Sequence, residues 1–274
     1  MDRYAVFGNP IAHSRSPEIH RLFAQQTGES LSYDKVEIPV EQFETAVAMF
    51  FQGGGKGLNI TLPFKLRALD VAHDLTERAR SAGAVNTLAY DNGRILGDNT
   101  DGAGMVADIL EQQGWTISAR RILLLGAGGA VRGVLQPLLM QSPAQVVIAN
   151  RTLSRAQDLC QAFGSQIPVS ACSFDALEGR QFDLVINGTS ASLAGDLPPL
   201  PDGLLAAGAD CYDMMYGREP TVFMHWARQH GASQCTDGLG MLVGQAAESF
   251  YLWRGVRPEV GPVLRYLRDA LGSA

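Results

Sequence analysis

A glycine-rich segment near the middle of the chain restricts the possible folds more than any other feature of the sequence. The apolar run Arg121–Leu125 leads directly into Gly126-Ala127-Gly128-Gly129-Ala130-Val131, and a helix-compatible stretch then continues to Met140. A strand, a glycine turn and a helix in this order are typical of dinucleotide-binding folds, because the turn and the helix start offer backbone N–H groups to a pyrophosphate. The alternative is a glycine turn with a purely structural role. Val131 replaces the Gly or Ala of the third fingerprint position, so we expect the helix to lie slightly further from the sheet than in the standard turn.

The end of the next expected strand indicates which dinucleotide would fit. About twenty residues after the glycine turn, NAD-specific folds carry an Asp or Glu that binds the ribose 2′-hydroxyl. This chain has Asn150-Arg151-Thr152 there, with Arg155 close behind. Guanidinium groups attract a 2′-phosphate that a carboxylate would repel, which favours NADP(H) over NAD(H). The alternative is that both arginines only solvate the start of a helix.

Short apolar runs alternate with helical patterns along the chain, which predicts an α/β fold. Buried parallel strands are expected at residues 121–125, 146–149, 183–187 and 209–212. We therefore expect an N-terminal α/β substrate-binding domain, a Rossmann-like doubly wound NADP-binding domain, and C-terminal helices that pack back on the substrate domain. The expected boundaries of these three parts are 1–101, 102–240 and 241–274.

Several local signals place elements around these strands. Ser16-Pro17 predicts a helix start with Ser16 as N-cap, since proline is tolerated at the first helical position. Helices are also expected at Glu41–Gln52 and Gly102–Gln113. Asp91-Asn92-Gly93 predicts a β-hairpin turn, and a break around Gly255–Pro258 divides the C-terminal segment into two helices.

Polar side chains lie close behind or within the apolar runs of the first ninety residues. These residues are Ser14, Ser16, Asn59, Thr61 and Asn86. Ligands bind at strand ends in α/β sheets, and neutral hydroxyl and amide groups there suit a hydroxylated carboxylic acid. Lys65 and Asp101 are expected near a cleft between the domains; the alternative is that each is a solvated surface charge.

The composition excludes several classes of function. The chain has 274 residues, 46% of them hydrophobic, and a net charge of −6, so a basic nucleic-acid-binding surface is not expected. The four cysteines stand singly, the N-terminus reaches a turn too soon for a signal peptide, and the histidines show no metal-ligand spacing. We expect a cytoplasmic protein that binds small molecules, with no membrane partner and no metal. Both a monomer and a homodimer fit this length and charge.

Seven spaced motifs identify a family resemblance over nearly the whole chain. They are Gly8-Asn9-Pro10-Ile11-Ala12-His13-Ser14-Arg15-Ser16-Pro17, Asn59-Ile60-Thr61-Leu62-Pro63-Phe64-Lys65, Gly83-Ala84-Val85-Asn86-Thr87, Gly126-Ala127-Gly128-Gly129-Ala130, Asn150-Arg151-Thr152, Tyr212-Asp213-Met214-Met215-Tyr216 and Asp237-Gly238-Leu239-Gly240-Met241-Leu242-Val243-Gly244-Gln245. In this order they resemble the shikimate dehydrogenases. The resemblance implies reversible, NADPH-dependent reduction of 3-dehydroshikimate to shikimate, in the route to chorismate and the aromatic amino acids.

The same resemblance implies roles for individual residues. Lys65 and Asp101 would be the catalytic pair. The substrate contacts would be Ser14, Ser16, Asn59, Thr61, Lys65, Asn86, Asp101, Tyr216 and Gln245. The NADP(H) contacts would be Glu77, Gly126, Ala127, Gly128, Gly129, Ala130, Asn150, Arg151, Thr152, Arg155, Thr189, Ser190, Met214, Gly238 and Met241, with the last three of these in the nicotinamide region. Glu77 could equally be an exposed helix residue.

Two alternatives to this function stay open. A paralogue that also oxidises quinate would share the lysine–aspartate pair but accept NAD more readily, which Asn150-Arg151 disfavours. A protein of another class, an NADP-binding sensor, would keep the fold without catalysis. For an enzyme, Lys65 is the expected proton donor to the substrate oxygen, and the sequence leaves open how the proton is shared with Asp101.

Overall fold

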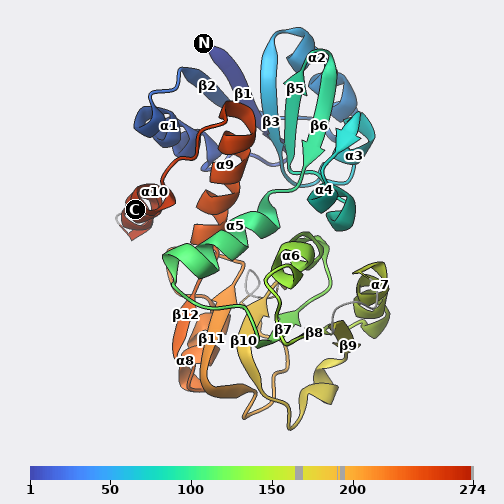
Figure 1. Ribbon diagram of the computed structural model, residues 1–274, viewed down its shortest axis with the longest axis vertical. Coiled ribbons are helices and arrows are strands. Elements are labelled where there is room, and N and C mark those ends of the chain that lie inside the picture. The colour runs from blue at the N-terminus through green and yellow to red at the C-terminus, as the bar shows by residue number, and fades with distance from the viewer. Residues whose placement is uncertain (164–168, 190, 192–194, 273–274) are drawn as a thin grey trace. The chain divides into compact units, whose positions relative to one another are not determined.

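The computed structural model (Figure 1) describes residues 1–163, 169–189, 191 and 195–272, and the chain divides into two compact units. Unit 1 comprises Met1–Gly104 and Leu242–Tyr266. Unit 2 comprises Met105–Met241 and Leu267–Ala274. Each unit contains one six-stranded sheet and is described by itself.

Unit 1 is built on a mixed sheet with the strand order β2-β1-β3-β5-β6-β4. β1 pairs in parallel with β2 and β3, whereas β5 pairs antiparallel with β3 and β6. The strands are β1 (Asp2–Gly8), β2 (Leu31–Glu37), β3 (Gly55–Ile60), β4 (Asp74–Leu75), β5 (Thr87–Asp91) and β6 (Arg94–Asp98). The helices of the N-terminal part are α1 (Ser16–Thr27), the 3-10 turn Val40–Gln42, α2 (Phe43–Gln52), α3 (Ala68–Val71) and α4 (Glu77–Ala82).

The C-terminal part of the chain contributes two helices, α9 (Leu239–Arg254) and α10 (Val260–Gly272). Trp253 of α9 stacks on Tyr4 of β1 at 4.7 Å between ring centroids, and its Nε1–H donates to the Leu88 carbonyl at 3.0 Å. Gly57 makes this contact possible, because a Cβ there would lie 2.3 Å from Trp253 Nε1. The expected return of a C-terminal helix to the N-terminal sheet is therefore confirmed.

Unit 2 is built on an entirely parallel sheet with the strand order β12-β11-β10-β7-β8-β9. The strands are β7 (Arg121–Leu125), β8 (Gln145–Ala149), β9 (Val169–Cys172), β10 (Phe182–Asn187), β11 (Leu205–Asp213) and β12 (Gln234–Thr236). The helices are α5 (Asp101–Ala107), which begins in unit 1, the π-helix Asp108–Gln112, α6 (Gly129–Leu139), α7 (Leu153–Phe163), the 3-10 turn Phe174–Leu177 and α8 (Val222–Gln229).

Apolar cores cover both faces of this parallel sheet. Ile122 and Leu124 belong to one core cluster and Leu123 and Leu125 to the other, and all four side chains are fully buried. Successive residues of a strand point to opposite faces, so β7 is buried on both sides, as parallel sheets require. The expected α/β class with a doubly wound, Rossmann-like sheet is confirmed.

Some local expectations need correction. Ser16 is not the N-cap of α1 but its first residue; Arg15 occupies the cap position and no side chain caps the helix. The Ser14 hydroxyl instead accepts the Ser16 N–H at 3.3 Å, and the Ser16 side chain is buried. The helix expected at Gly102–Gln113 changes after Ala107 into a π-helix.

The predicted hairpin is confirmed. Asn92 and Gly93 have φ values of 48° and 83°, and Asp91 pairs with Arg94. Positive φ at both central residues is the backbone geometry of the type I′ turn, which Asn-Gly favours.

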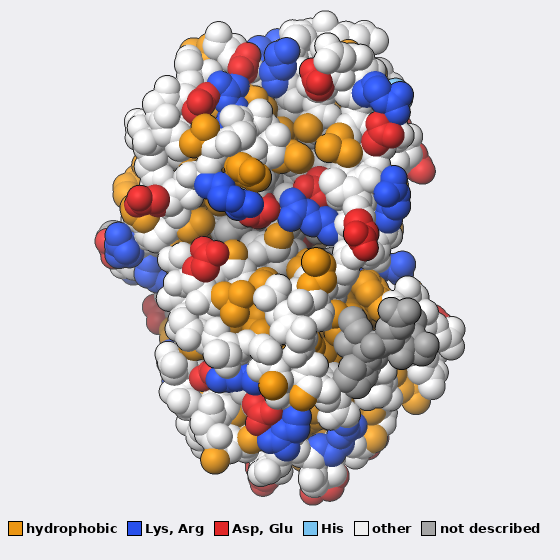
Figure 2. All heavy atoms as spheres, viewed as in Figure 1, with side chains coloured by type: hydrophobic (Ala, Val, Ile, Leu, Met, Phe, Trp, Pro, Cys, Tyr) orange, Lys and Arg blue, Asp and Glu red, His pale blue; other side chains and the backbone are white. Residues whose placement is uncertain are grey.

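The surface carries charges of both signs. On the face shown in Figure 2, Lys and Arg side chains are interspersed with Asp and Glu. In the part of the chain that the structure describes, none of the helices combines the length and apolar character that a membrane span needs.

Candidate active site

A close ion pair in unit 1 joins two residues that the sequence places 36 positions apart. The Lys65 ammonium donates to Asp101 Oδ2 at 2.6 Å, and the two side chains are 28% and 15% exposed. Lys65 lies in the segment that follows β3, and Asp101 begins α5 directly after β6. The two charges therefore neutralise each other while the ammonium keeps donors for a further partner, since a lysine carries three.

Asn86 holds the other oxygen of the Asp101 carboxylate. Its Nδ2 donates to Asp101 Oδ1 at 2.9 Å, and its Oδ1 accepts the Thr100 backbone N–H at 2.8 Å. The amide is buried at 2% exposure and so has one defined orientation. Because both carboxylate oxygens are engaged, the plane of the Asp101 carboxylate is fixed relative to Lys65.

Two glycines bring Gln245 of α9 into this cluster. A Cβ on Gly104 would lie 2.3 Å from the Gln245 backbone nitrogen, and a Cβ on Gly244 would lie 2.7 Å from the Gly104 carbonyl oxygen. This close approach of α5 and α9 lets Gln245 Oε1 accept from Asn86 Nδ2 at 3.4 Å, a long hydrogen bond.

A buried hydrogen-bond network continues from this cluster to Asn59. Asn59 Nδ2 donates to Thr87 Oγ1 at 3.1 Å and to Ser249 Oγ at 2.9 Å, and its Oδ1 accepts from the Tyr33 hydroxyl at 2.7 Å. Thr87, Ser249 and the neighbouring Thr100 are fully buried. Sequence reasoning missed Tyr33, Thr87, Thr100 and Ser249 as site residues. Thr87 and Thr100 adjoin predicted site residues in the chain, whereas nothing local marks Ser249.

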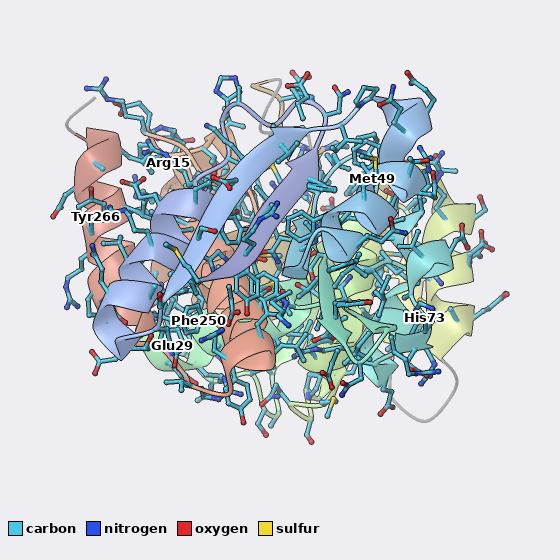
Figure 3. All side chains as sticks on the ribbon, turned by 90° about the horizontal axis from the view of Figure 1, so that it is seen from above. Arg15, Glu29, Met49, His73, Phe250 and Tyr266 are labelled. Atoms are coloured by element: carbon cyan, nitrogen blue, oxygen red, sulfur yellow. The ribbon has the colours of Figure 1, made fainter. Side chains whose placement is uncertain are left out.

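An aromatic cluster backs Tyr33. The His20 ring stacks on Tyr33 at 4.2 Å between centroids and lies 6.2 Å from the ring of Phe250, which Figure 3 labels. His20 is fully buried beside Asn59, and within the described residues no hydrogen bond of good geometry reaches either ring nitrogen. Burial lowers the pKa of His20 to about 3, so the ring is neutral near pH 7. Burial also raises the pKa of Tyr33 well above its usual value, so its hydroxyl remains a donor.

The remaining substrate candidates of unit 1 follow strand ends. Ser14 and Ser16 lie between β1 and the first turn of α1, and Thr61 follows β3. The parallel register pairs Phe7 with Ile60, which aligns the ends of β1 and β3. Unit 1 thus brings Asn59, Lys65, Asn86, Asp101 and Gln245 into one bonded cluster, with Thr61 next to it in sequence. Tyr216 lies in unit 2 and is partly exposed.

The glycine turn of unit 2 has an open surface where α6 begins. Gly126 has a φ of +100°, and a Cβ there would lie 3.2 Å from Thr189 Cγ2. Gly128, Gly129 and Ala130 are exposed, and among the described residues no atom beyond the adjoining chain lies within 4 Å of the place that a Cβ would occupy on either glycine. The first N–H groups of a helix lack partners within the helix, so this turn suits a pyrophosphate. Ala127 is partly buried against the core.

Val131 is accommodated by a second glycine. Its side chain is fully buried, and a Cβ on Gly188, in the turn after β10, would lie 2.4 Å from Val131 Cγ2. The larger side chain therefore fits because the facing residue has none.

The residues after β8 present exposed cations. Arg151, Thr152 and Arg155 are exposed, while Asn150 Nδ2 donates to the Thr152 carbonyl at 2.7 Å and shapes the turn. Within the described residues, neither guanidinium group forms an ion pair. Both arginines are thus free to bind a phosphate, and the turn fits the adenosine end of NADP(H).

Two loops that follow β11 and β12 lie against each other. The Gly238 N–H donates to the Met215 carbonyl at 3.0 Å, and a Cβ on Gly238 would lie 2.2 Å from the Met214 carbonyl oxygen. Met241 packs against the same core cluster as Met214. The three residues expected around the nicotinamide are therefore brought together.

The other cofactor candidates are more scattered. Thr189 Oγ1 donates to Asn187 Oδ1 at 2.7 Å, next to the glycine turn. Ser190 lies outside the described residues. Glu77 is exposed at the start of α4 in unit 1.

The fold and these residues define a two-unit α/β protein in which one unit has the features of a dinucleotide-binding domain. Three family descriptions match the chain: "Shikimate dehydrogenase substrate binding domain" over residues 6–88, "Shikimate / quinate 5-dehydrogenase" over 108–194 and "Shikimate 5'-dehydrogenase C-terminal domain" over 238–268. The chain belongs to the shikimate dehydrogenase family.

Individual relatives agree with this membership. "Shikimate dehydrogenase (NADP(+))" of Cellvibrio japonicus is 62% identical over 98% of both chains, and the protein of that name from Alkalilimnicola ehrlichii is 60% identical over 97% of this chain and 98% of its own. The Ael1 enzyme of Pseudomonas putida has a similar structure, with a TM-score of 0.93, 47% identity and coverage of 97% and 98%. The shikimate 5-dehydrogenase of Thermus thermophilus, solved with NADP(H) and shikimate, gives a TM-score of 0.88, 33% identity and coverage of 99% and 100%.

Proposed function

We propose that this chain catalyses the reversible, NADPH-dependent reduction of 3-dehydroshikimate to shikimate. The observation that carries the proposal is the Lys65–Asp101 ion pair, held at 2.6 Å in a chain 62% identical to a protein named NADP(+)-dependent shikimate dehydrogenase. The solved Thermus thermophilus relative supports both ligands, since it contains NADP(H) and shikimate. We assign substrate binding to unit 1 and NADP(H) binding to unit 2, close to the boundaries expected from sequence.

Unit 2 would hold the cofactor through three groups of residues. The N–H groups of the glycine turn 126–130 would bind the pyrophosphate, and Asn150, Arg151, Thr152 and Arg155 would bind the adenosine phosphate end. Met214, Gly238 and Met241 would surround the nicotinamide, with Thr189 and Ser190 near its ribose. When bound, NADPH supplies the hydride that the ketone carbon of the substrate receives.

Lys65 would supply the proton that the reduction requires. As the ketone carbon gains a hydride, its oxygen gains a proton from the Lys65 ammonium, which leaves a neutral amine that is reprotonated from solvent. In the reverse direction, the neutral amine takes the hydroxyl proton. Asp101, fixed by Asn86, orients Lys65.

Neutral polar groups would recognise the rest of the substrate. Shikimate carries hydroxyl groups and one carboxylate, and hydroxyl and amide side chains can both donate to and accept from such groups. Within unit 1 these are Ser14, Ser16, Asn59, Thr61, Asn86 and Gln245, and we add Tyr216 of unit 2 on the family resemblance.

The composition supports a cytoplasmic enzyme that acts on small molecules. Cys160, Cys172, Cys211 and Cys235 are all free thiols, which is typical of proteins in a reducing compartment. The net charge of −6 disfavours a nucleic-acid partner.

A steady-state assay tests the proposed function directly. NADPH absorbance is followed with 3-dehydroshikimate, and the reverse reaction is run with shikimate or quinate against NADP⁺ and NAD⁺. Fast turnover restricted to shikimate and NADP⁺ is expected. Comparable rates with quinate or NAD⁺ would favour the broader paralogue, and tight NADPH binding without turnover would favour a sensor.

A further inference from the structure

A buried tyrosine and a buried aspartate support the loop that carries Gly238 and Met241. We propose that Tyr212 and Asp108 are positioning residues for the nicotinamide-binding loop, residues 237–241. The proposal rests on the proposed function, because that function assigns Gly238 and Met241 to the nicotinamide. Neither Tyr212 nor Asp108 is among the site residues described above.

The Tyr212 hydroxyl connects the loop to Asp108. Tyr212 lies in β11 with 0% exposure, and its hydroxyl donates to Asp108 Oδ2 at 2.6 Å. The Met241 backbone N–H lies near the same hydroxyl. Burial next to the Asp108 carboxylate raises the pKa of Tyr212 well above its usual value, so the hydroxyl keeps its proton and its bond to Asp108 persists.

A π turn in its own helix lets Asp108 receive hydrogen bonds from Gln113. It is 1% exposed and begins the π-helix Asp108–Gln112. The wider turn lets Gln113 return to Asp108 twice, since its backbone N–H donates to the Asp108 carbonyl at 3.0 Å and its Nε2 donates to Asp108 Oδ1 at 3.0 Å. Single π turns inside α-helices are frequent at functional sites. Both carboxylate oxygens of Asp108 therefore have donors.

The loop itself lies directly on the Asp108 carboxylate. A Cβ on Gly240 would lie 2.1 Å from Asp108 Oδ1, so only glycine fits there. The neighbouring Asp237 Oδ1 accepts the Leu239 N–H at 3.2 Å, and Arg268 pairs with the same carboxylate at 2.5 Å.

Side chains that precede α9 or belong to other elements support the first turn of this helix. The N–H groups at a helix start have no partner within the helix. Asp237 takes the Leu239 N–H, and Gly240 rests on the Asp108 carboxylate that the Tyr212 hydroxyl binds, so the positions of Gly238 and Met241 depend on these buried side chains. A small displacement of a reacting group can cost up to about a hundredfold in rate, so the effect should appear in the chemical step.

Tyr212→Phe tests the proposal most directly. The variant keeps the ring and removes only the hydroxyl, which leaves Asp108 Oδ2 without its donor beneath the loop. We expect kcat to fall about tenfold and NADPH to bind about tenfold more weakly, with KM for 3-dehydroshikimate unchanged. The primary isotope effect with C4-deuterated NADPH should rise, because hydride transfer becomes more strongly rate-limiting. Tyr251→Phe, at an exposed tyrosine of α9, is the matched control and should behave as the unmodified protein.

Asp108→Asn is the second variant in case Tyr212→Phe does not fold. It keeps the shape of the side chain but leaves one of its two donors, Tyr212 or Gln113, facing an amide N–H, and we expect an effect on the same parameters in the same direction. Unchanged kcat, isotope effect and NADPH dissociation constant in a folded variant, even with a lower Tm, would overturn the proposal. The dissociation constant is measured from NADPH fluorescence and needs no turnover. Failure of the proposed reaction would therefore be seen separately, as an inactive unmodified protein whose NADPH affinity still responds to Tyr212→Phe.

Discussion

The Lys65 ammonium is the one side-chain group whose removal should stop the proposed chemistry without removing the substrate. Lys65→Ala is expected to lower kcat by about 10²–10⁴, the usual contribution of a general acid, and to change the dissociation constant of shikimate far less. Lys56→Ala, at an exposed lysine of β3, is the control. Turnover and equilibrium binding of shikimate are the two measurements, and a Lys65→Ala protein with normal turnover would exclude Lys65 as proton donor.

The two exposed arginines after β8 should determine the choice of dinucleotide. A charged hydrogen bond contributes about 1.5–3 kcal/mol, so Arg151→Gln with Arg155→Gln should raise KM for NADPH at least tenfold. KM for NADH should change little, because NADH lacks the 2′-phosphate. Arg21→Gln, an exposed arginine of α1, controls for the loss of positive charge. Equal effects on the two cofactors would contradict the 2′-phosphate assignment.

Elements with strong periodicity or turn chemistry could be predicted from the sequence, whereas short ones could not. β7, β8 and β10 are continuous apolar runs, and Asn92-Gly93 requires the positive φ that a type I′ turn provides. β4 and β12 have only two and three residues, too few to show a period. The π-helix after α5 depends on tertiary contacts of Asp108, which no local pattern encodes.

Ser249 of α9 is the most important site residue that the sequence did not indicate. Its hydroxyl lies within 2.9 Å of Asn59 Nδ2 and 2.8 Å of Thr87 Oγ1. Its partners are 190 and 162 positions away in the chain, and a serine inside an apolar helix carries no mark of such a role. Spacing alone could therefore identify Asn59 and Asn86 as candidates but not the group that orients Asn59.

Ser249→Ala should consequently affect stability and substrate binding together. It removes the nearest acceptor of Asn59 Nδ2 and so weakens the buried network of unit 1, which costs about 1–3 kcal/mol. Tm should fall, and KM for shikimate should rise several-fold while KM for NADP⁺ stays constant. Ser118→Ala, at an exposed serine of unit 2, should change neither. If thermal denaturation and both KM values of Ser249→Ala match the unmodified chain, the network does not position Asn59.

Folding of the chain buries the neutral side chain of His20. The free energy of unfolding should therefore depend on pH between about 3 and 6.5. The pKa of His20 is lowered by burial from 6.5 to about 3. Between these values the unfolded chain binds a proton at His20 and the folded chain does not, so the free energy of unfolding falls as the pH falls. The loss is about 1.4 kcal/mol per pH unit below 6.5.

His20→Phe removes this linkage while it retains the stacking on Tyr33. Urea denaturation should show that the unmodified chain loses about 0.7 kcal/mol more than the variant between pH 7 and 6, and about 1.2 kcal/mol more between pH 6 and 5. Carboxylates such as Asp2, whose pKa Arg254 lowers, titrate in both proteins, so their contribution cancels in this difference. His225→Gln, at an exposed histidine of α8, should leave the dependence unchanged. Because no hydrogen bond of good geometry reaches either His20 nitrogen, the phenylalanine variant should also be at least as stable at pH 7, since its ring buries no poorly bonded polar atom. Parallel stability curves for the variant and the unmodified chain would show instead that His20 is solvated or protonated in the folded protein.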